Sequence, residues 1–534
     1  MVRIRAKLLL LLAGALVVAG CTKPGDTGNN NQGNTPQRGG ELTVLLDSAF
    51  SGSWPSGLDP ATNTTGGGNL TQMSAIYGGL FRLVADDDGK NARVVPHQAA
   101  GFEFADGGTT VKIKIKPGLK FTDGTAFDAA AVVFNIKRAM EATCTCKPTW
   151  QLADQDPITA EGTDTVVLKF KQPNAAVINS FVVANVNWVV SPTALQSMGP
   201  DAFRIKPVGA GPFKVVSNAL SSELVLERNP DYFVKDRPYL DKLTIRSIGG
   251  DQPAYQALQA GQGQVYEGMT TIPLLEQAKK NSQLVVTQQP ATSPYVIQLN
   301  TKIPPFNDKR AREAIYYATN GEAIRQGLFK GAYPLSQSFT ADGGLFHHPT
   351  VPGYRTYDLE KAKALVQQLG GLTVDLGTLK AYVADQVNTA LQTQWEAAGI
   401  KTTIHSEQLN GLIQNFIGGK WQAMLQTAGA WDPAVGVGVG FRFSSGVPFS
   451  GVSDPTIDSL LQQAGQSTDP AQRDALYMQV GQRISDEAYA PFILAFAPAS
   501  VVTKNVHGPG LTTLIPPVVV NTAILWDEVW MSQA

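Results

Sequence analysis

The sequence predicts an α/β protein with at least two lobes. An N-terminal leader precedes about five hundred residues, which is more than one hydrophobic core usually organises. Residues 110–116 alternate valine or isoleucine with lysine, the period-two pattern of a strand with one face in water. In the C-terminal half, helices with clear caps alternate with short strands, and this alternation indicates an α/β lobe.

Two stretches of the C-terminal half carry the clearest signals for this alternation. Asp358 is expected to cap a helix, apolar residues follow it at helical spacing, and Gly370 ends the helix. A second helix is expected over residues 387–398, and a strand over residues 400–404 follows it directly.

The N-terminus has the features of an export signal. Three cations within the first seven residues precede an apolar or small-residue run over residues 8–20. This run is shorter than the roughly 20 residues that a membrane-spanning helix needs, so it is a secretory signal. It ends in Val18-Ala19-Gly20-Cys21, which resembles a bacterial lipobox. That resemblance implies removal of residues 1–20 and lipidation of Cys21; the alternative is a free cysteine beside an ordinary cleavage site.

The segment after the leader is not expected to fold. Residues 22–37 are mainly Gly, Asn, Thr, Gln and Pro and include no large apolar side chain. Such a segment cannot bury enough surface to offset the entropy of ordering it. Residues 21–38 are therefore predicted to be the lipidated cysteine and a disordered tether. No stretch beyond the leader is apolar enough to cross a membrane.

The charge balance excludes one class of partner. The chain carries 43 Lys and Arg against 44 Asp and Glu, and without the three cations of the leader the net charge is about −4. Nucleic-acid binding would require a basic stripe. No nucleic-acid partner is therefore expected.

Two cysteines remain besides Cys21, at Cys144 and Cys146. In an oxidising compartment they can pair, although a single residue between them makes a strained ring. A C-x-C metal site is the alternative, but no second pair of ligands lies nearby in the sequence. No metal site is therefore assigned.

A secreted hydrolase is the natural alternative for a large exported protein. The sequence has no nucleophile elbow and no zinc-binding His-Glu-x-x-His motif. The adjacent His347 and His348 are expected to be loop residues rather than metal ligands. The glycines at 436, 438 and 440 lack the lysine of a phosphate-binding loop, so a flexible or closely packed loop is expected. No catalytic residue and no cofactor are predicted.

Short motifs follow one another in a fixed order from residue 39 to about residue 500. Most of them are turns and helix caps that are weak when taken alone. The set comprises Gly39-Gly40-Glu41-Leu42-Thr43-Val44, Leu58-Asp59-Pro60, Ile76-Tyr77-Gly78-Gly79-Leu80, Asp106-Gly107, Leu119-Lys120-Phe121-Thr122-Asp123-Gly124-Thr125, Val132-Val133-Phe134, Val208-Gly209-Ala210-Gly211-Pro212-Phe213, Arg228-Asn229-Pro230-Asp231-Tyr232-Phe233, Pro238-Tyr239-Leu240-Asp241-Lys242, Leu299-Asn300-Thr301, Pro304-Pro305-Phe306, Arg310 with Arg312, and Tyr357-Asp358. In this order the motifs resemble those of the family 5 extracellular solute-binding proteins, the peptide and nickel binders of ABC importers. Gly209 and Gly211 are expected to permit tight turns beside Pro212.

The resemblance implies a periplasmic-binding-protein-like α/β fold with two lobes, a hinge and an inserted α+β subdomain, the cluster C type of architecture. Lobe I would comprise residues 39–76, 190–290 and 500–534. The inserted subdomain would comprise residues 77–189, and lobe III residues 291–499. The ligand would lie between lobes I and III, where closure desolvates it and its polar ends need partners.

The resemblance also implies the function of a substrate-binding component of an ABC importer. The protein would capture peptides or related polar small molecules outside the membrane and deliver them to the permease, while the importer's ATPase subunits supply the energy. It would need no cofactor and would be a monomer. Lipidated Cys21 would hold it on the outer face of the cell membrane, which is the periplasmic side where an outer membrane exists.

One departure from the family pattern bears on the ligand. Peptide binders that resemble this chain place an acidic residue in lobe III, three positions before an Asp-Pro pair, where it accepts the peptide ammonium. The pair here is Asp432-Pro433, and Gly429 stands at the acidic position. A buried ammonium without a carboxylate would cost several kcal/mol. Either Asp432 is the polar contact, or the ligand is not an ordinary free-amine peptide; Asp432 can also be a turn-forming residue before proline.

Five further residues are candidate ligand contacts. Trp431 offers a rigid aromatic wall, although it can equally pack in the core. Tyr295 follows the expected hinge crossing and can donate its hydroxyl. Ser48 and Phe50 end the first strand, where loops of an α/β lobe commonly face the cleft. Arg442 can pair with a ligand carboxylate, although an exposed arginine is the commoner case.

The residues leave the ligand class open. A nickel chelate would need His405 or His347 to face the cleft, and nothing in the sequence places them there. Oligosaccharides and opine-like compounds are favoured by the tryptophan and by the missing acidic residue. A sensory receptor is the remaining class, and a preserved ligand-sized cleft would argue against it.

Overall fold

The computed structural model describes most of the chain beyond the leader. The described residues are 35–63, 69–86, 91–142, 144, 146–380, 382–427, 429–435, 438–447, 449–517 and 522–532. The chain from Pro36 onward forms one compact unit. The predicted signal, Cys21 and nearly all of the predicted tether lie outside the described residues.

The first large element is a seven-stranded mixed sheet with the order β12-β18-β11-β1-β10-β9-β8. β1 (Glu41–Asp47) runs parallel to both of its neighbours, β10 (Lys242–Ile248) and β11 (Val265–Met269). Leu42, Val44 and Leu46 of β1 belong to one buried cluster and Leu45 to another, so both faces of the strand are covered. The remaining strands are β8 (Phe213–Ala219), β9 (Glu223–Arg228), β12 (Leu284–Gln288) and β18 (Ala499–Thr503).

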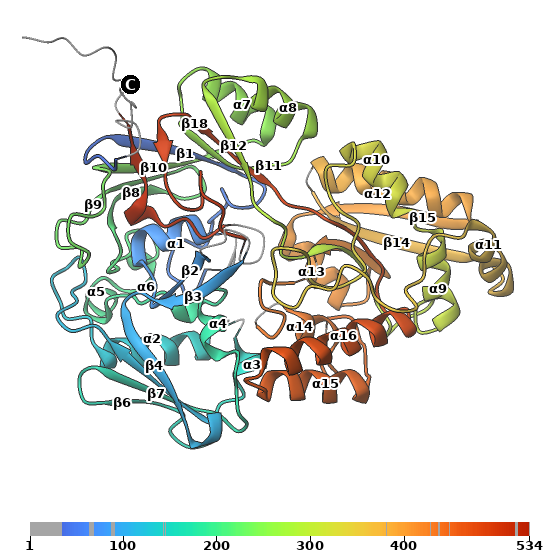
Figure 1. Ribbon diagram of the computed structural model, residues 1–534, viewed down its shortest axis with the longest axis horizontal. Helices are drawn as coiled ribbons and strands as arrows, with labels where there is room; N and C mark the ends of the chain where they lie inside the picture. The colour runs from blue at the N-terminus through green and yellow to red at the C-terminus, as the bar shows by residue number, and fades with distance from the viewer. Residues whose placement is uncertain are drawn as a thin grey trace, which may run out of the picture. The chain divides into compact units, whose positions relative to one another are not determined.

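Helices cover this sheet on both faces. α7 (Asp251–Gln259) packs against β11, and α8 (Ile272–Lys280) packs against β12; the two helices lie side by side (Figure 1). On the other face lie α1 (Leu70–Tyr77), α5 (Pro192–Met198) and α6 (Pro200–Phe203). The C-terminal segment adds a short antiparallel pair, β19 (Val506–His507) with β20 (Trp530–Met531).

The second large sheet has five strands in the order β15-β14-β16-β13-β17. β14 runs parallel to β15 and β16, whereas β13 is antiparallel to β16 and β17. The strands are β13 (Pro294–Leu299), β14 (Leu372–Leu379), β15 (Ile400–Glu407), β16 (Ala423–Thr427) and β17 (Phe492–Ala495). The helices of this part are α9 (Lys309–Ala318), α10 (Gly321–Phe329), α11 (Leu359–Gln368), α12 (Tyr382–Ala397), α13 (Leu409–Ile417), α14 (Val439–Phe443), α15 (Pro455–Gln466) and α16 (Pro470–Asp486).

The helix–strand alternation predicted for this half is confirmed. The Asp358 side chain accepts a hydrogen bond from the backbone of Lys361 and so caps α11, and Gly370 just beyond the helix has a φ of 75°. The predicted helix over 387–398 is part of α12, and β15 follows it after two residues. Local capping and hydrophobic spacing therefore determine these elements.

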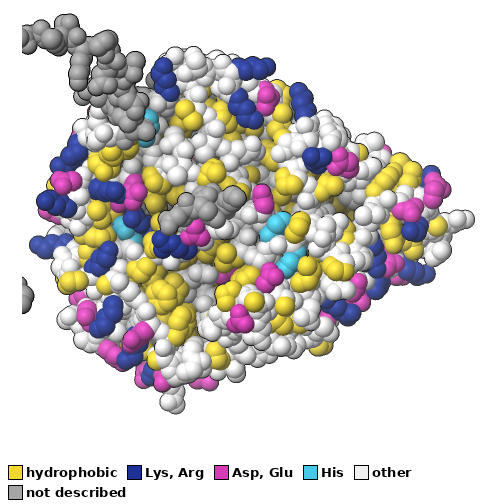
Figure 2. All heavy atoms as spheres, viewed as in Figure 1, with side chains coloured by type: hydrophobic (Ala, Val, Ile, Leu, Met, Phe, Trp, Pro, Cys, Tyr) yellow, Lys and Arg dark blue, Asp and Glu magenta, His cyan; other side chains and the backbone are white. Residues whose placement is uncertain are grey.

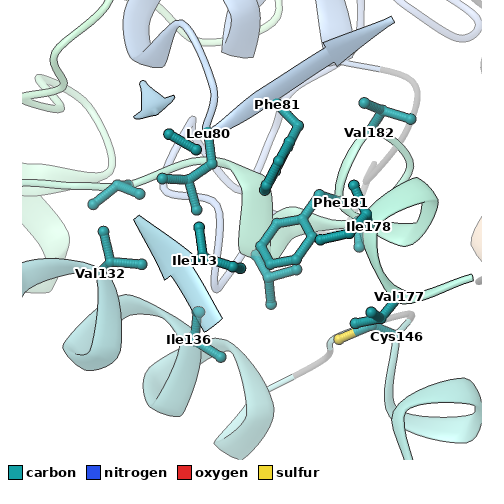
Figure 3. Packing of buried hydrophobic residues seen from close by; sticks show 14 of the residues in the cluster. Leu80, Phe81, Ile113, Val132, Ile136, Cys146, Val177, Ile178, Phe181 and Val182 are labelled. Carbon is teal, nitrogen blue, oxygen red and sulfur yellow. The ribbon is translucent and has the colours of Figure 1, made fainter. Parts of the chain in front are cut away.

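A four-stranded antiparallel sheet, in the order β4-β5-β7-β6, forms the core of the third part together with α2. Val111, Ile113 and Ile115 of β5 are buried, which confirms the strand predicted from their alternation with lysine. Figure 3 shows Ile113 facing Val132 and Ile136 of α2 and Phe181. The elements are β2 (Phe81–Ala85), β3 (Ala92–Pro96), β4 (Ala99–Ala105), β5 (Thr110–Ile115), α2 (Ala129–Glu141), α3 (Lys147–Trp150), β6 (Ile158–Glu161), β7 (Thr165–Lys169) and α4 (Val177–Phe181).

Cys144 and Cys146 are joined by a disulfide, and both are buried. The alternative of a C-x-C metal site is therefore wrong, because a disulfide leaves no thiolate to bind a metal ion. No described group of three or more His, Cys, Asp or Glu side chains is arranged to hold a metal ion.

Two chain segments connect the two large sheets in the described part of the chain: residues 289–293 between β12 and β13, and residues 496–498 between β17 and β18. Gln288 Nε2 donates a hydrogen bond to Ala497 O (3.3 Å), so the two connections run side by side. Paired crossings of this kind form a hinge. We propose that lobe I, the inserted subdomain and lobe III have the boundaries predicted from the sequence.

The paired glycines of the Gly209-Ala210-Gly211 motif have a different role from the one expected. Neither glycine has a positive φ, so neither supplies a left-handed turn. A Cβ atom at Gly209 would lie 2.4 Å from the carbonyl oxygen of Ile76, and one at Gly211 would lie 2.6 Å from the same atom. The glycines are therefore required because this loop packs directly against the backbone at the end of α1.

None of the helices that the structure describes combines the length and the apolar composition of a membrane span. On the face seen in Figure 2, Lys and Arg side chains are interspersed with Asp and Glu and form no continuous basic stripe among the described residues.

Candidate functional site

Lobe III meets the inserted subdomain through residues 429–435, the loop that follows β16. Ala430, Trp431 and Val435 belong to the same buried cluster as Val177, Ile178 and Phe181 of the inserted subdomain, the last three of which are labelled in Figure 3. A second contact joins the same two parts, because Ala175 N donates to Gly465 O (2.9 Å) at the end of α15. The two parts are therefore in direct contact, as expected for a closed form.

Trp431 lies within this contact and is 2% exposed. Its backbone oxygen accepts a hydrogen bond from Leu345 N (2.8 Å), which fixes the loop. The indole packs among residues of the inserted subdomain. Its role as a wall for the ligand stays a prediction.

Asp432 is fully buried and both of its carboxylate oxygens are engaged by protein. Arg473 Nη2 of α16 donates to Oδ1 (3.0 Å) and Oδ2 (3.3 Å), and Asn179 Nδ2 of the inserted subdomain donates to Oδ2 (2.8 Å). Ala434 N also donates to Oδ1 (2.9 Å), as in the turn expected before proline. In this form Asp432 binds the protein on both sides of the contact, and its role as a ligand contact stays a prediction.

Gly429 has room for a side chain. A Cβ atom at this position would meet Phe339 O at 3.6 Å and the Cα of Gly438 at 3.8 Å, both ordinary contacts. Its φ is not positive, so a larger residue would not strain the backbone. Nothing steric in the described surroundings therefore requires a glycine where related peptide binders carry an acid.

Tyr295, the second residue of strand β13 after the hinge, is buried, with 8% of its surface exposed. Its ring stacks on Phe496 at 5.0 Å between centroids, and its backbone pairs with Thr427 of β16. Burial raises the pKa of Tyr295 above its usual value, with a smaller contribution from Tyr333. The hydroxyl therefore remains protonated and can serve as a hydrogen-bond donor at neutral pH.

Ser48 and Phe50 follow β1 directly in lobe I. Ser48 is exposed and its N–H donates to Ile248 O (2.8 Å); Phe50 is half-buried and its N–H donates to Asp47 O (3.1 Å). Both lie at the carboxyl end of the parallel strands β1 and β10, where the binding loops of such sheets are found. Their contact with a ligand stays a prediction.

Arg442 lies in the last turn of α14 and is 6% exposed, so it is not the exposed surface arginine that is the commoner case. Its Nη2 donates to Thr427 O (2.6 Å), and its guanidinium lies over the ring of Phe449 at 5.3 Å. Burial lowers the pKa of Arg442 to about 9. None of the described acidic residues forms an ion pair with it.

Glu267 of β11 is a buried charge-bearing group that the sequence analysis missed. It is 5% exposed, Thr71 Oγ1 donates to its Oε2 (2.6 Å), and its Oε1 has no hydrogen-bond partner among the described residues. Burial raises the pKa of Glu267 to about 7, although hydrogen bonds from Thr71 and from the backbone of Thr522 lower it. The inward-facing Val265 two residues earlier is the signal that could have placed this side chain inside the sheet.

The histidines considered for a nickel chelate have protein partners. His405 Nε2 lies 2.8 Å from Asp375 Oδ1, and its ring stacks on Trp421 at 3.9 Å. His347 Nδ1 lies 2.9 Å from Thr340 O. The structure does not bring these two side chains together with a third ligand in the described region.

A small cavity of about 30 Å³ lies within lobe I and the inserted subdomain. Its lining includes the charged or polar side chains of Ser74, Arg82, His97, Asn187, Tyr232 and Asp527, and it has no lining residue from lobe III. A ligand held between lobes I and III would therefore not occupy it.

Comparison with known families gives the decisive observation. Residues 93–446, more than half of the chain, match the family described as bacterial extracellular solute-binding proteins, family 5. The chain belongs to that family. The expected resemblance is confirmed, and the protein is an extracellular solute-binding protein.

Curated relatives of this family member are named as binding proteins. The glutathione-binding protein GsiB of Pectobacterium atrosepticum is 27% identical over 473 residues, which cover 82% of this chain and 86% of that protein. The glutathione-binding protein GsiB of Escherichia coli K12 is 26% identical over 466 residues, covering 81% and 86%.

Solved structures confirm the predicted fold class. The ABC transporter-associated periplasmic binding protein DppA from Helicobacter pylori, in complex with the peptide STSA, has a TM-score of 0.76 at 20% identity, covering 93% of this chain and 99% of that one. MoaA from A. tumefaciens, in complex with mannopinic acid, has a TM-score of 0.77 at 19% identity, covering 93% and 100%. NikA from Staphylococcus aureus with Ni(L-His)2 has a TM-score of 0.74 at 16% identity, covering 90% and 100%.

The buried carboxyl of Glu267 predicts a pH-dependent stability. Because its pKa is about 7 in the folded protein and 4.5 in the unfolded chain, the folded state retains the proton between these values. The free energy of unfolding should therefore fall by roughly 3 kcal/mol as the pH rises from below 4.5 to above 7. Glu267→Gln, which is neutral throughout, should lack this decrease in urea unfolding at pH 5 and pH 8. Glu103→Gln on the exposed part of β4 is the matched control, and equal slopes for wild type and Glu267→Gln would contradict the assignment.

The hydrogen bond between Asn179 and Asp432 predicts a change in the closure equilibrium. Asn179→Ala removes a donor to a charged acceptor across the contact, an interaction that contributes about 1.5–3 kcal/mol. The ligand-free variant should therefore be more open than wild type, with a larger radius of gyration in small-angle X-ray scattering. Asn185→Ala is the control, because Asn185 donates to Pro60 O and not to lobe III. If the scattering profiles of both variants and of wild type were identical, the hydrogen bond would not affect the closure equilibrium.

Proposed function

We propose that the solute is a peptide or a related small polar molecule, captured between lobes I and III outside the membrane and delivered to an ABC permease. The observation that supports this most directly is the relationship over most of both chains to proteins named for binding glutathione, itself a tripeptide. Neighbours of the same fold hold a tetrapeptide and an opine acid. The ATPase subunits of the importer would supply the energy, so the binding protein itself would need no cofactor. We also propose that it acts as a monomer.

Closure of the lobes is the proposed binding step. The hinge connections at 289–293 and 496–498 allow lobe III to move as a body, and the Asn179–Asp432 hydrogen bond forms when lobe III reaches the inserted subdomain. A ligand that contacts both sides binds the closed form better and so increases its population. The permease would then receive the closed, loaded form.

Gly429 favours one class of ligand over another within this proposal. An ordinary peptide presents a free α-ammonium that needs a carboxylate when it is buried. Both oxygens of Asp432 are already engaged, and Gly429 offers no carboxylate. Peptides and opine-like compounds whose amino group is acylated or stays in solvent avoid this cost, and they form the second candidate class.

We further propose that the mature protein is anchored to the outer face of the cell membrane through lipidated Cys21. The support is the sequence alone, since Val18-Ala19-Gly20-Cys21 closes a secretory core and the polar segment 22–37 can act as a tether. Such an anchor suits a protein that must stay near its permease.

Replacement of Cys21 tests the anchor. Cys21→Ser removes the only thiol that can be acylated at the cleavage site, so the protein should move from the membrane pellet to the soluble fraction after cell lysis or osmotic shock. Mass spectrometry of the wild-type N-terminus should show a diacylglycerol group on Cys21. A wild-type protein that is found soluble and unmodified would exclude the anchor.

Gly429→Asp tests the ligand class. Isothermal titration calorimetry on the mature protein should show stronger binding of N-acetylated di- and tripeptides than of the same peptides with a free α-ammonium. The new carboxylate should strengthen the binding of free-amine peptides by about tenfold, whereas the neutral control Gly429→Asn should not. If ordinary peptides bind wild type best and Gly429→Asp changes nothing, the position does not face the ligand's amino end.

A further inference from the structure

Arg442 leaves most of its hydrogen-bonding capacity unused although it is buried. Nη2 donates to Thr427 O (2.6 Å), whereas Nε and Nη1 have no partner among the described residues. A guanidinium has five N–H donors in a fixed fork, and a buried donor without a partner is destabilising. A structural arginine would be expected to have these donors satisfied.

The other buried arginines of lobe III show the difference. Arg312 donates through Nη1 to Phe306 O and through Nε and Nη2 to Glu487 O, so all three of its nitrogens are bound. Arg473 has one buried nitrogen, Nε, without a partner among the described residues, but its guanidinium is paired with the carboxylate of Asp432. Arg442 has neither a set of carbonyls nor a carboxylate in the described part of the chain.

Two glutamine side chains with unpaired amides lie on the sheet face that α14 covers. Val296 of β13 belongs to the same buried cluster as Val439 and Phe443 of α14, so α14 packs on this face. Gln298 lies two residues after Val296, and Gln426 is the cross-strand partner of Val296, so both side chains project to the same face. Gln298 Nε2 and Oε1 and Gln426 Nε2 have no hydrogen-bond partner among the described residues.

The location of this group fits the binding cleft. Thr427, whose carbonyl fixes the guanidinium, pairs with Tyr295 at the end of β13 that follows the hinge. The chain continues from Thr427 into residues 429–435, which contact the inserted subdomain. Arg442 therefore lies at the end of the five-stranded sheet where β16 leads into the loop that contacts the inserted subdomain.

We propose that Arg442, together with Gln298 and Gln426, forms an anion site in lobe III that receives a carboxylate of the bound solute. A carboxylate accepts two parallel N–H bonds from a guanidinium, and the amide N–H groups of the glutamines can donate to the same anion. The site thereby restricts the solute to acidic molecules and orients the acidic end toward lobe III. This inference rests on the proposed function, because it assigns one end of the solute that the lobes enclose.

The charge state of the arginine agrees with this role. Burial lowers the pKa of Arg442 to about 9, so the side chain is still mainly protonated at neutral pH but its charge is uncompensated. A carboxylate placed against it would raise the pKa again. The association would therefore be favourable over the whole neutral range and would weaken above pH 9.

Small carboxylates provide the first test, and they do not depend on the identity of the natural solute. Acetate, succinate and glutarate at tens of millimolar, compared with chloride at equal ionic strength, should raise the melting temperature of the wild-type mature protein. Arg442→Gln should abolish the rise, and Arg442→Lys, which keeps the charge but loses the fork, should retain only part of it. Arg312→Gln is the control: it should lower the melting temperature but keep the carboxylate effect. An absent rise in wild type, or an equal rise in wild type and Arg442→Gln, overturns the anion site.

The second test compares acids with their amides on the wild-type protein, so it holds even if the Arg442 variants fold poorly. Glutathione and short peptides should bind about 30-fold more tightly than their carboxamides in calorimetry, and Arg442→Gln should reduce this ratio to about threefold or less. Equal affinities for acid and amide in wild type overturn the anion site while leaving the peptide proposal intact. If no peptide binds but succinate stabilises wild type through Arg442, the peptide proposal fails and the anion site stands.

Discussion

The carboxylate of Asp432 joins three segments that are distant in the sequence, and the contact between lobe III and the inserted subdomain is arranged around it. It is fully buried, and moving a carboxylate out of water costs several kcal/mol unless charged and polar partners replace the water. Arg473 supplies the charge from within lobe III, and Asn179 supplies a donor from the other side of the contact. In the proposed closure, the closed form is the one in which this buried carboxylate has all of these partners, and opening would remove Asn179 from it.

The need of a buried charge for partners distinguishes the charged residues that stabilise the fold from those that we propose to bind the solute. Because Asp432 is occupied, it cannot accept a ligand ammonium without breaking an ion pair, and Gly429 does not replace it. Arg442 is the opposite case, since it is buried and has a single acceptor among the residues that the structure describes. In lobe I, Glu267 is buried, one of its carboxylate oxygens has no partner in the same described part of the chain, and its pKa is raised to about 7. Among its described residues, lobe III thus has unpaired N–H donors for a solute but no free carboxylate in the loop after β16. An acid at position 429 would instead have supplied a negatively charged acceptor.

Individual helices and strands could be predicted from the sequence, but the long-range contacts between residues could not. Asp358 and Gly370 delimit α11, and the valine–isoleucine alternation marks β5, because caps and periodicity act within a few residues. The segment around Trp431 and Asp432 could be singled out from the Asp-Pro pair. Its partners Asn179 and Arg473 could not, because they are brought there by packing between separate parts of the fold. The spacing of Cys144 and Cys146 allowed a metal site or a disulfide, and only the geometry decided between them. The glycine motif around Gly209 predicts a tight turn, but the constraint on Gly209 is its close approach to the backbone of Ile76 in α1.

The central claim is that the lobes enclose an acidic solute whose carboxylate meets Arg442. Native mass spectrometry of the mature protein from its own host, followed by release and identification of the bound molecule, tests it most directly. We expect a single small solute, bound one to one, that carries at least one carboxylate and is lost from Arg442→Gln. A neutral oligosaccharide, a mixture of peptides that Arg442→Gln retains equally, or a protein that is always empty would contradict it.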